Sequence, residues 1–192
     1  MGLISRRQNS DYKCYHLLMN FIYHGVPEPM IGNELIPLNQ MGTALREIRD
    51  KNLEKYEGRE EMLERKIPLL DCLWNDVVQF LPLHPKKVFE IQKELELIPD
   101  VPAYKFYEID VSSLDPSKAV VFFKTAPGEE NVKVKWLSEV DFMTLQDIPE
   151  ATVAYYKTFV GTVGLPFNYQ FIPHIVYNGS VSIANATVIT LS

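Results

Sequence analysis

The sequence predicts an α+β fold, arranged as a single compact domain, on three observations. Residues 41–65 and 85–95 repeat apolar side chains at helical spacing among charged ones, which is typical of amphipathic helices. Residues 104–123 contain two β-type runs around a turn, and residues 169–191 contain two more. Because helical patterns gather in the first half and strand patterns in the second, the order favours an α+β arrangement.

Composition limits the classes of function. A chain of 192 residues with 46% apolar side chains is long enough for one core, so we expect a flexible segment at 1–11 and one domain at 12–192. The net charge of -6 and the pI near 5.3 argue against a general nucleic-acid binder, which would place a basic face against phosphates. Cys14 and Cys72 form no CxxC pair, which is typical of buried thiols in a reducing cytoplasm. With no secretion signal or membrane-spanning run recognised, we expect a cytoplasmic protein without a membrane partner.

The first half is predicted to hold the helices. Residues 12–25 are apolar and aromatic without a clear period, so they suit a strand, a short helix, or one after the other. Residues 41–65 are expected to be helical, with Gly58 as the residue that would split the helix. Residues 77–80 have strand character. Pro85 is well placed as the first residue of a helix, because its missing N–H would have no partner there.

The middle of the fold is predicted from residues 104–123. Residues 104–111 alternate along the chain, whereas residues 119–123 are continuously apolar, which indicates a strand buried on both faces. Asp115-Pro116-Ser117 is a turn former between them, so the two runs are expected to form a central strand pair. A further strand is expected at 132–136.

The end of the chain is predicted to form a hairpin. Residues 151–163 leave strand and helix both open, since β-branched and aromatic residues favour a strand and the Ala and Tyr spacing allows a helix. Residues 169–177 and 181–191 are predicted strands. Asn178-Gly179 joins them and suits the positive φ angles of a tight turn.

No common catalytic signature is present in the sequence. It contains no phosphate-binding GxxxxGK[ST] loop, no GxGxxG, no GxSxG and no HExxH pair. The four histidines are scattered, so no metal site is predicted. Instead, hydrogen-bonding groups are embedded in apolar stretches, at Tyr15 with His16, Phe80 with His84, and Gln170 with His174. Such groups need partners, which either a satisfied core or a shared cleft would supply.

Several short phrases follow one another in a recognisable order. They are Tyr15-His16, GNELIPLN at 32–39, VVQFLPLHP at 77–85, FYEIDV at 106–111 and QFIPHIVYNGSV at 170–181. In this order they resemble the ADP-ribosyltransferase superfold, with the DarT-type toxins and related uncharacterised domains as the nearest likeness. The resemblance implies two small antiparallel sheets around a cleft that binds NAD or a related nucleotide.

The resemblance also implies a set of ligand-binding residues. It implies that His16 hydrogen-bonds the ribose of NAD, with His24 as the rival for that role. It implies that the ring of Phe80 or Tyr107 walls the nicotinamide pocket by stacking. The full ligand-binding set is Tyr15, His16, His24, Phe80, His84 and Tyr107.

The catalytic position departs from the family's pattern. The family places a catalytic glutamate on its late strand, where a carboxylate stabilises developing positive charge. Here the resemblance puts Gln170 and His174 in that place, and no Asp or Glu follows Glu150. The resemblance therefore implies a member degenerate in ADP-ribosyl transfer or NAD glycohydrolysis, rather than an efficient enzyme.

A second class of function remains open. A non-enzymatic interaction protein, such as an immunity protein, an antitoxin or a phage-encoded inhibitor, would cover a protein partner with its aromatic surface. A purely structural role is a third reading. The sequence leaves open the oligomeric state and the identity of any substrate.

Overall fold

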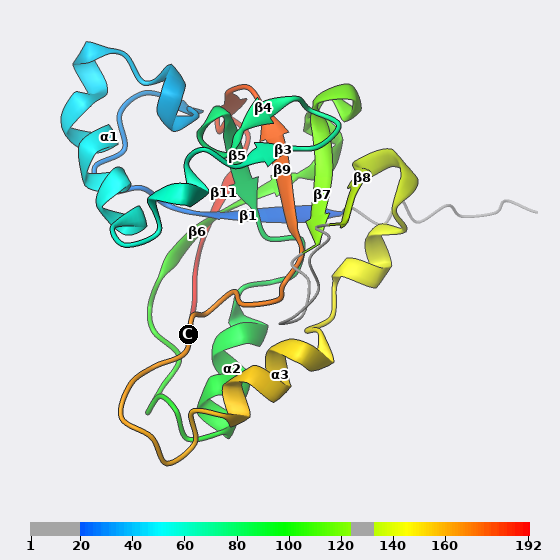
Figure 1. Cartoon of the computed structure of the whole chain (residues 1–192). Helices are drawn as coiled ribbons and strands as arrows, with labels where there is room; N and C mark the ends of the chain where they lie inside the picture. The colour runs from blue at the N-terminus through cyan, green and yellow to red at the C-terminus, as the bar shows by residue number, and fades with distance from the viewer. Residues whose placement is uncertain (1–19, 124–132) are drawn as a thin grey trace, which may run out of the picture.

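The computed structural model describes residues 20–123 and 133–192 (Figure 1). The predicted flexible segment 1–11 lies outside these described residues, as do Tyr15 and His16. Three α-helices and four small antiparallel sheets make up the described part, which confirms the predicted α+β class. Figure 1 shows α1 beside the sheets in the upper half of the molecule, and α2 and α3 together below them.

The α-helices are short. They are α1 (Arg46–Leu53), α2 (Lys86–Glu94) and α3 (Glu150–Lys157). Short 3-10 helices fill much of the remainder: η1 (Leu38–Gln40), η2 (Thr43–Leu45), η3 (Glu54–Tyr56), η4 (Glu60–Met62), η5 (Trp74–Asp76), η6 (Val111–Ser113), η7 (Pro116–Lys118), η8 (Leu137–Glu139) and η9 (Phe142–Leu145).

Helix predictions are confirmed in type but not in length. The predicted helix at 41–65 divides into η2, α1, η3 and η4, and Gly58 ends its first part with a φ of 74°. Pro85 precedes the first residue of α2 rather than being that residue. The stretch 151–163, which the sequence left open, is helical as far as Lys157.

The larger sheet has four strands in the order β5-β9-β7-β8. These strands are β5 (Val77–Phe80), β9 (His174–Asn178), β7 (Ala119–Phe123) and β8 (Lys133–Trp136). The four apolar residues that begin β7 are all buried, as predicted for a strand covered on both faces. By contrast, β8 forms an edge, and its alternate lysines face solvent, which discourages pairing with another chain.

The other sheet of more than two strands has the order β1-β6-β11. Its strands are β1 (Phe21–Gly25), β6 (Lys105–Asp110) and β11 (Thr187–Thr190). Two further pairs are two residues long: β2 (Glu34–Leu35) with β10 (Val181–Ser182), and β3 (Lys66–Ile67) with β4 (Cys72–Leu73). The described part of the undecided stretch 12–25 therefore ends in a strand.

The two main sheets are joined through backbone hydrogen bonds. Tyr23 N donates to Leu81 O at 2.9 Å, and Leu81 N donates to Tyr23 O at 2.8 Å. Because Tyr23 lies in β1 and Leu81 directly follows β5, this bridge holds the edge of one sheet against the end of the other.

The predicted C-terminal hairpin is wrong. Residues 169–173 are not a strand, and β9 begins only at His174. Both edges of β9 are occupied, one by β5 and one by β7, so no edge remains for the chain that follows Gly179. That chain divides instead into β10, which pairs with β2, and β11, which pairs with β6.

The predicted central strand pair is also wrong. The strands β6 and β7 form as expected on either side of the turn at 115–117, but they belong to different sheets. The strand β6 is occupied by β1 and β11, whereas β7 is occupied by β9 and β8. Asp115 accepts a hydrogen bond from Ser117 N at 3.0 Å, so this turn is stabilised locally without any strand pairing.

The core has three buried clusters. One lies between the two main sheets and includes Ile22, Phe80 and Ile175. A second packs α2 and α3 against the three-stranded sheet around Tyr156. The third covers the other face of the four-stranded sheet with Trp74 and Phe122, whose rings meet edge to face at 5.1 Å.

Truncation at the centre of the four-stranded sheet is predicted to be severe. Ile175 is completely buried in β9 between β5 and β7, so Ile175→Ala should lower the free energy of unfolding by about 2–5 kcal/mol. Urea denaturation followed by fluorescence would measure the loss. Val188→Ala on the exposed side of β11 is the control and should change stability by less than about 0.5 kcal/mol. Equal losses in the two variants would contradict the described core.

Candidate functional site

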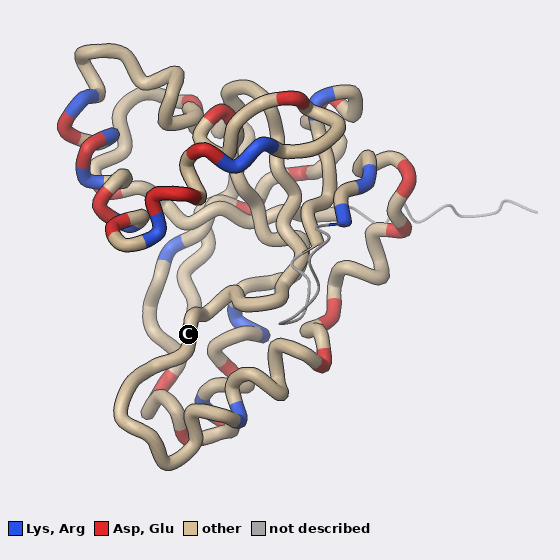
Figure 2. Tube along the Cα trace, in the orientation of Figure 1, with Lys and Arg blue, Asp and Glu red and all other residues tan. Residues whose placement is uncertain are grey.

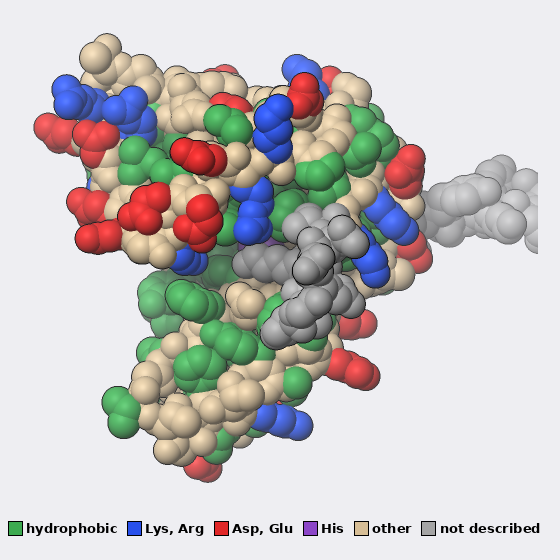
Figure 3. Space-filling model, in the orientation of Figure 1, with side chains coloured by type: hydrophobic (Ala, Val, Ile, Leu, Met, Phe, Trp, Pro, Cys, Tyr) green, Lys and Arg blue, Asp and Glu red, His purple; other side chains and the backbone are tan. Residues whose placement is uncertain are grey.

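Figure 1 shows the part of the molecule that carries α1 above the part that carries α2 and α3. A cleft of about 1090 Å³ is lined from the α1 part and from the strands, and no residue of α2 or α3 lines it. Figure 3 shows this side of the surface, where a hollow separates the two parts and histidine atoms, drawn purple, are visible at its edge. The end of β1, the strand β5 and the start of β6 line the cleft, together with residues 26–38 and the helical turns 45–56. Its volume is at the upper limit of small-molecule pockets.

Aromatic rings contribute to the lining beside leucine, isoleucine and methionine side chains. The rings come from Tyr23, Tyr56, Trp74, Phe80, Tyr104, Phe106 and Tyr169. Tyr104 is 54% exposed, so its ring is accessible to a bound molecule. Phe80 is 1% exposed, and its ring packs edge to face against the His24 ring with 5.7 Å between the ring centroids.

His24 presents a defined tautomer to the cleft. Its Nδ1 lies 2.8 Å from the carbonyl oxygen of Gln79. Because a carbonyl only accepts hydrogen bonds, Nδ1 carries the proton, and the neutral ring keeps a lone pair on Nε2. Burial lowers the pKa of His24, the bond to Gln79 opposes this shift, and the nearby charge of Lys55 lowers the pKa further. The ring is therefore neutral at pH 7 and offers a hydrogen-bond acceptor.

Two lysines line the cleft from α1 and η3. Lys51 and Lys55 are four residues apart, which places them on one side of the helical segment. Burial and the repulsion of Lys51 lower the pKa of Lys55, whose Nζ donates to Asn52 Oδ1 at 2.6 Å. Neither lysine forms a salt bridge with a described carboxylate. This side of the cleft therefore suits an anionic group.

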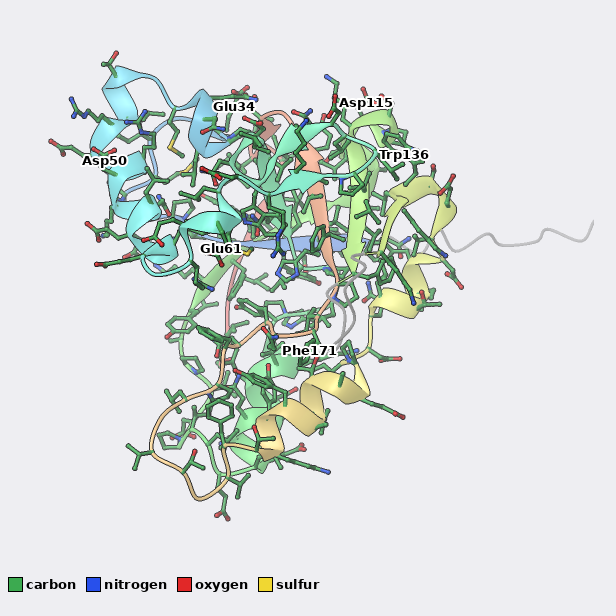
Figure 4. All side chains as sticks on the ribbon, in the orientation of Figure 1. Glu34, Asp50, Glu61, Asp115, Trp136 and Phe171 are labelled. Carbon is green, nitrogen blue, oxygen red and sulfur yellow. The ribbon has the colours of Figure 1, made fainter. Side chains whose placement is uncertain are left out.

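A contact joins the two sides of the molecule beside the cleft. The Arg59 guanidinium, in the turn after η3, lies 5.4 Å from the centroid of the Phe167 ring, in the loop after α3. Arg59 also donates a hydrogen bond to the backbone oxygen of Lys55. In Figure 4, Asp50 and Glu61 mark the α1 side of the cleft, and Phe171 marks the side near α2 and α3.

The structure brings three of the predicted site residues into this one cleft. They are His24, Phe80 and His174. His174 is buried at the start of β9, where its Nδ1 lies 2.8 Å from Ile172 O and its ring stands edge to face with Tyr169 at 6.4 Å. Gln170 does not line the cleft. It lies in the turn before β9, where its backbone oxygen accepts a hydrogen bond from Thr152 at 2.8 Å.

Two further predicted ligand-binding residues lie elsewhere. His84 accepts a hydrogen bond from Lys86 N at 3.2 Å and therefore helps to begin α2. Its ring packs against Tyr23 at 5.1 Å, outside the cleft lining. Tyr107 is buried in the core between the sheets and does not line the cleft either. Tyr15 and His16 fall outside the described residues.

Sequence reasoning missed four residues that the cleft brings together: Lys51, Lys55, Asn75 and Tyr104. The four-residue spacing of the lysines was visible, but in a segment rich in both charges it resembles any solvated helix face. Tyr104 begins a strand and looks like an ordinary alternating residue. Asn75 lies between Trp74 and Asp76, and the sequence around it gives no sign that it lines a cleft rather than forming an ordinary turn.

Comparison with known proteins finds no matching family model, curated protein or solved structure. Within the part of the chain that the structure describes, no set of three or more His, Cys, Asp or Glu side chains could hold a metal ion. Among these residues there is also no helix with the length and apolar character that crossing a membrane requires.

The neutral state of His24 predicts a pH-dependent stability. The unfolded chain takes up a proton on this imidazole near its ordinary pKa of 6.5, whereas the folded chain resists protonation, so folding loses stability as the pH falls below that value. In His24→Asn, which keeps a side-chain N–H, the free energy of unfolding should fall less between pH 7.5 and 5.5 than in the unmodified chain. Urea titrations at several pH values would measure this difference.

The effect of His84 must be separated in the same experiment. Burial also lowers the pKa of His84, so His84→Asn is the matched variant, and the double variant should show the smallest pH dependence of the three. A His24→Asn curve parallel to that of the unmodified chain would contradict the buried, neutral imidazole.

Proposed function

We propose that the cleft binds a nucleotide, with NAD as the first candidate, and that the protein turns it over slowly or not at all. The observation that carries this proposal is the meeting of His24, Phe80 and His174, which come from three separate strands, in one aromatic cleft edged by two lysines. The ADP-ribosyltransferase-like resemblance stated above is the reason for placing NAD first.

The chemistry of the lining suits the parts of such a ligand. The Nε2 lone pair of His24 accepts a hydrogen bond from a sugar hydroxyl, the role for which His24 rivals His16. Lys51 and Lys55 attract phosphate oxygens, because an ammonium donates charge-assisted hydrogen bonds. The exposed ring of Tyr104 offers a stacking surface for a base.

Weak catalysis follows from the placement of the carboxylates. Glu28, Glu34 and Glu54 line the cleft, but all three side chains are exposed to water. Charge stabilisation of an oxocarbenium-like state is strongest where water is excluded, and there the cleft presents His174. An imidazole on β9 does not supply the negative charge that the usual route of ADP-ribosyl transfer needs.

Calorimetry with NAD and with ADP-ribose tests the proposal. Both ligands should bind the full-length chain, and His24→Ala should weaken binding by roughly tenfold, the effect of one lost hydrogen bond. His16→Ala tests the rival residue. His84→Ala, which lies outside the cleft, is the control and should leave the affinity unchanged. If neither ligand produces heat of binding, the nucleotide proposal is wrong.

Release of nicotinamide from NAD, followed by chromatography, tests the catalytic part separately. We expect no release above the rate without protein. Rapid release that Gln170→Ala or His174→Ala abolishes would show that these residues replace the missing acid.

One observation favours the interaction-protein alternative as a second candidate. From Thr158 to Ser192 the chain contains no Asp, Glu, Lys or Arg, and Figure 2 shows the loop after α3 without charge colours. Within this loop Val160, Val163, Leu165 and Phe167 are each more than half exposed. A group of exposed apolar side chains on one loop is typical of a protein-binding surface.

Substitution in this loop separates the two functions. If the loop holds a protein partner, Val163→Asp should abolish co-purification of a stoichiometric partner on size-exclusion chromatography and leave NAD binding intact. Met143→Asp, at an exposed apolar residue in η9, is the matched control and should retain the partner. A partner that stays bound to Val163→Asp would exclude the loop as its docking site.

A further inference from the structure

Asn75 is a buried amide that lines the cleft. It lies in η5 and is 7% exposed. Its two neighbours are fixed by hydrogen bonds: Trp74 Nε1 donates to Tyr56 OH at 3.2 Å, and Asp76 Oδ1 accepts from Asn39 at 2.7 Å. The backbone of Asn75 is therefore held between two hydrogen-bonded residues, whereas its side-chain oxygen has no hydrogen-bond partner among the described residues.

The amide of Asn75 has no hydrogen-bond partner in the described part of the chain. Its Oδ1 is buried and has no partner among the described residues, and no hydrogen bond of its Nδ2 to a described residue is found. The other three buried polar side chains all have partners: Gln92 donates to Asn168 at 3.1 Å, Thr152 donates to Gln170 O at 2.8 Å, and the His174 ring bonds Ile172 O at 2.8 Å. A buried polar group without a hydrogen-bond partner is unfavourable. A bound molecule that hydrogen-bonds the Asn75 amide would therefore stabilise it.

Asn75 lines the cleft, and its side-chain oxygen and nitrogen can exchange places by rotation about χ2. Rotation about χ2 of asparagine has broad minima, and no hydrogen bond opposes it here, so either the oxygen or the nitrogen can be presented to a bound molecule. The aromatic residues Tyr56 and Trp74 border the same wall, which favours a flat ring beside the amide.

We propose that Asn75 is a specificity-determining residue, whose side-chain carbonyl accepts a hydrogen bond from the –NH₂ group of a flat heteroaromatic ligand. This chemistry occurs in the carboxamide of nicotinamide and in the amino group of adenine. The proposal rests on the proposed nucleotide function and adds the group by which the ligand is selected. An oxygen acceptor in a buried, apolar setting discriminates against ligands that lack the donor, because its desolvation is then uncompensated.

Two pairs of compounds that differ only in the –NH₂ group distinguish the sources. NAD is compared with 3-acetylpyridine adenine dinucleotide, in which a methyl group replaces the carboxamide –NH₂, and adenosine is compared with purine riboside, which lacks the amino group. Affinities are measured by calorimetry for the dinucleotides and by ligand-detected NMR for the nucleosides. One pair should show about tenfold weaker binding of the compound without the donor.

Asn75→Leu removes the acceptor and keeps the approximate volume. In this variant the two members of the discriminating pair should bind alike, whereas Asn185→Leu, an exposed asparagine in the turn before β11, should keep the difference. Equal affinities within both pairs on the unmodified chain overturn the proposal, and so does a difference that persists in Asn75→Leu. If neither dinucleotide binds, the NAD proposal fails and the adenosine pair alone decides about Asn75. Absence of binding by all four compounds overturns both.

A stability measurement without ligand keeps the two proposals separate. Replacement of an unpartnered amide by an apolar group should leave the thermal midpoint of Asn75→Leu equal to or above that of the unmodified chain. Gln92→Met is the matched control and should lower the midpoint, because it breaks the bond to Asn168. A drop in Asn75→Leu as large as that in Gln92→Met would show that the amide is structural and would overturn the inference.

Discussion

The reciprocal hydrogen bonds between Tyr23 and Leu81, at 2.9 and 2.8 Å, set where the cleft lies. They hold β1 against the chain that leaves β5, so the edge of the three-stranded sheet meets the four-stranded sheet at one point. Immediately beside this bridge, the His24 ring reaches the backbone oxygen of Gln79. The tautomer and the direction of the imidazole thus depend on the junction of the sheets, rather than on any feature of β1 alone.

The electrostatic character of the cleft follows from the same junction. Burial at the junction keeps His24 neutral, and the turns around α1 place Lys51 and Lys55 beside it. A neutral acceptor next to cationic donors complements a ligand that carries hydroxyl groups on one part and negative charge on another. The exposed acids Glu28, Glu34 and Glu54 balance the lysines in water, and no other carboxylate of the described residues lines the cleft.

Local patterns in the sequence predicted most strands and helices, but neither of the two predicted strand pairings forms. The continuous apolar run of β7 is a property of adjacent residues and matches the structure, whereas Pro85 stands one position before α2 rather than at its first residue. The hairpin expected at Gly179 fails, although the turn chemistry there is favourable, because β9 already has a strand on each edge. A favourable turn stabilises the fold less than two complete ladders of backbone hydrogen bonds do. Those ladders join residues about 50 to 100 positions apart in the sequence.

Residue type and order were sufficient to predict the α+β class and the acidic charge, because these depend on composition and on the spacing of apolar residues. They also indicated His24, Phe80 and His174 as candidate site residues. Only the tertiary structure decided that these three residues share a cleft while Gln170, His84 and Tyr107 do not line it. It also decided that Lys51, Lys55 and Asn75 face the same space. The physical reason is that a cleft is made by sheet edges and turns that meet across long stretches of chain. Burial of the Asn75 amide without a partner among the described residues also depends on that meeting, and no neighbouring residue in the sequence indicates it.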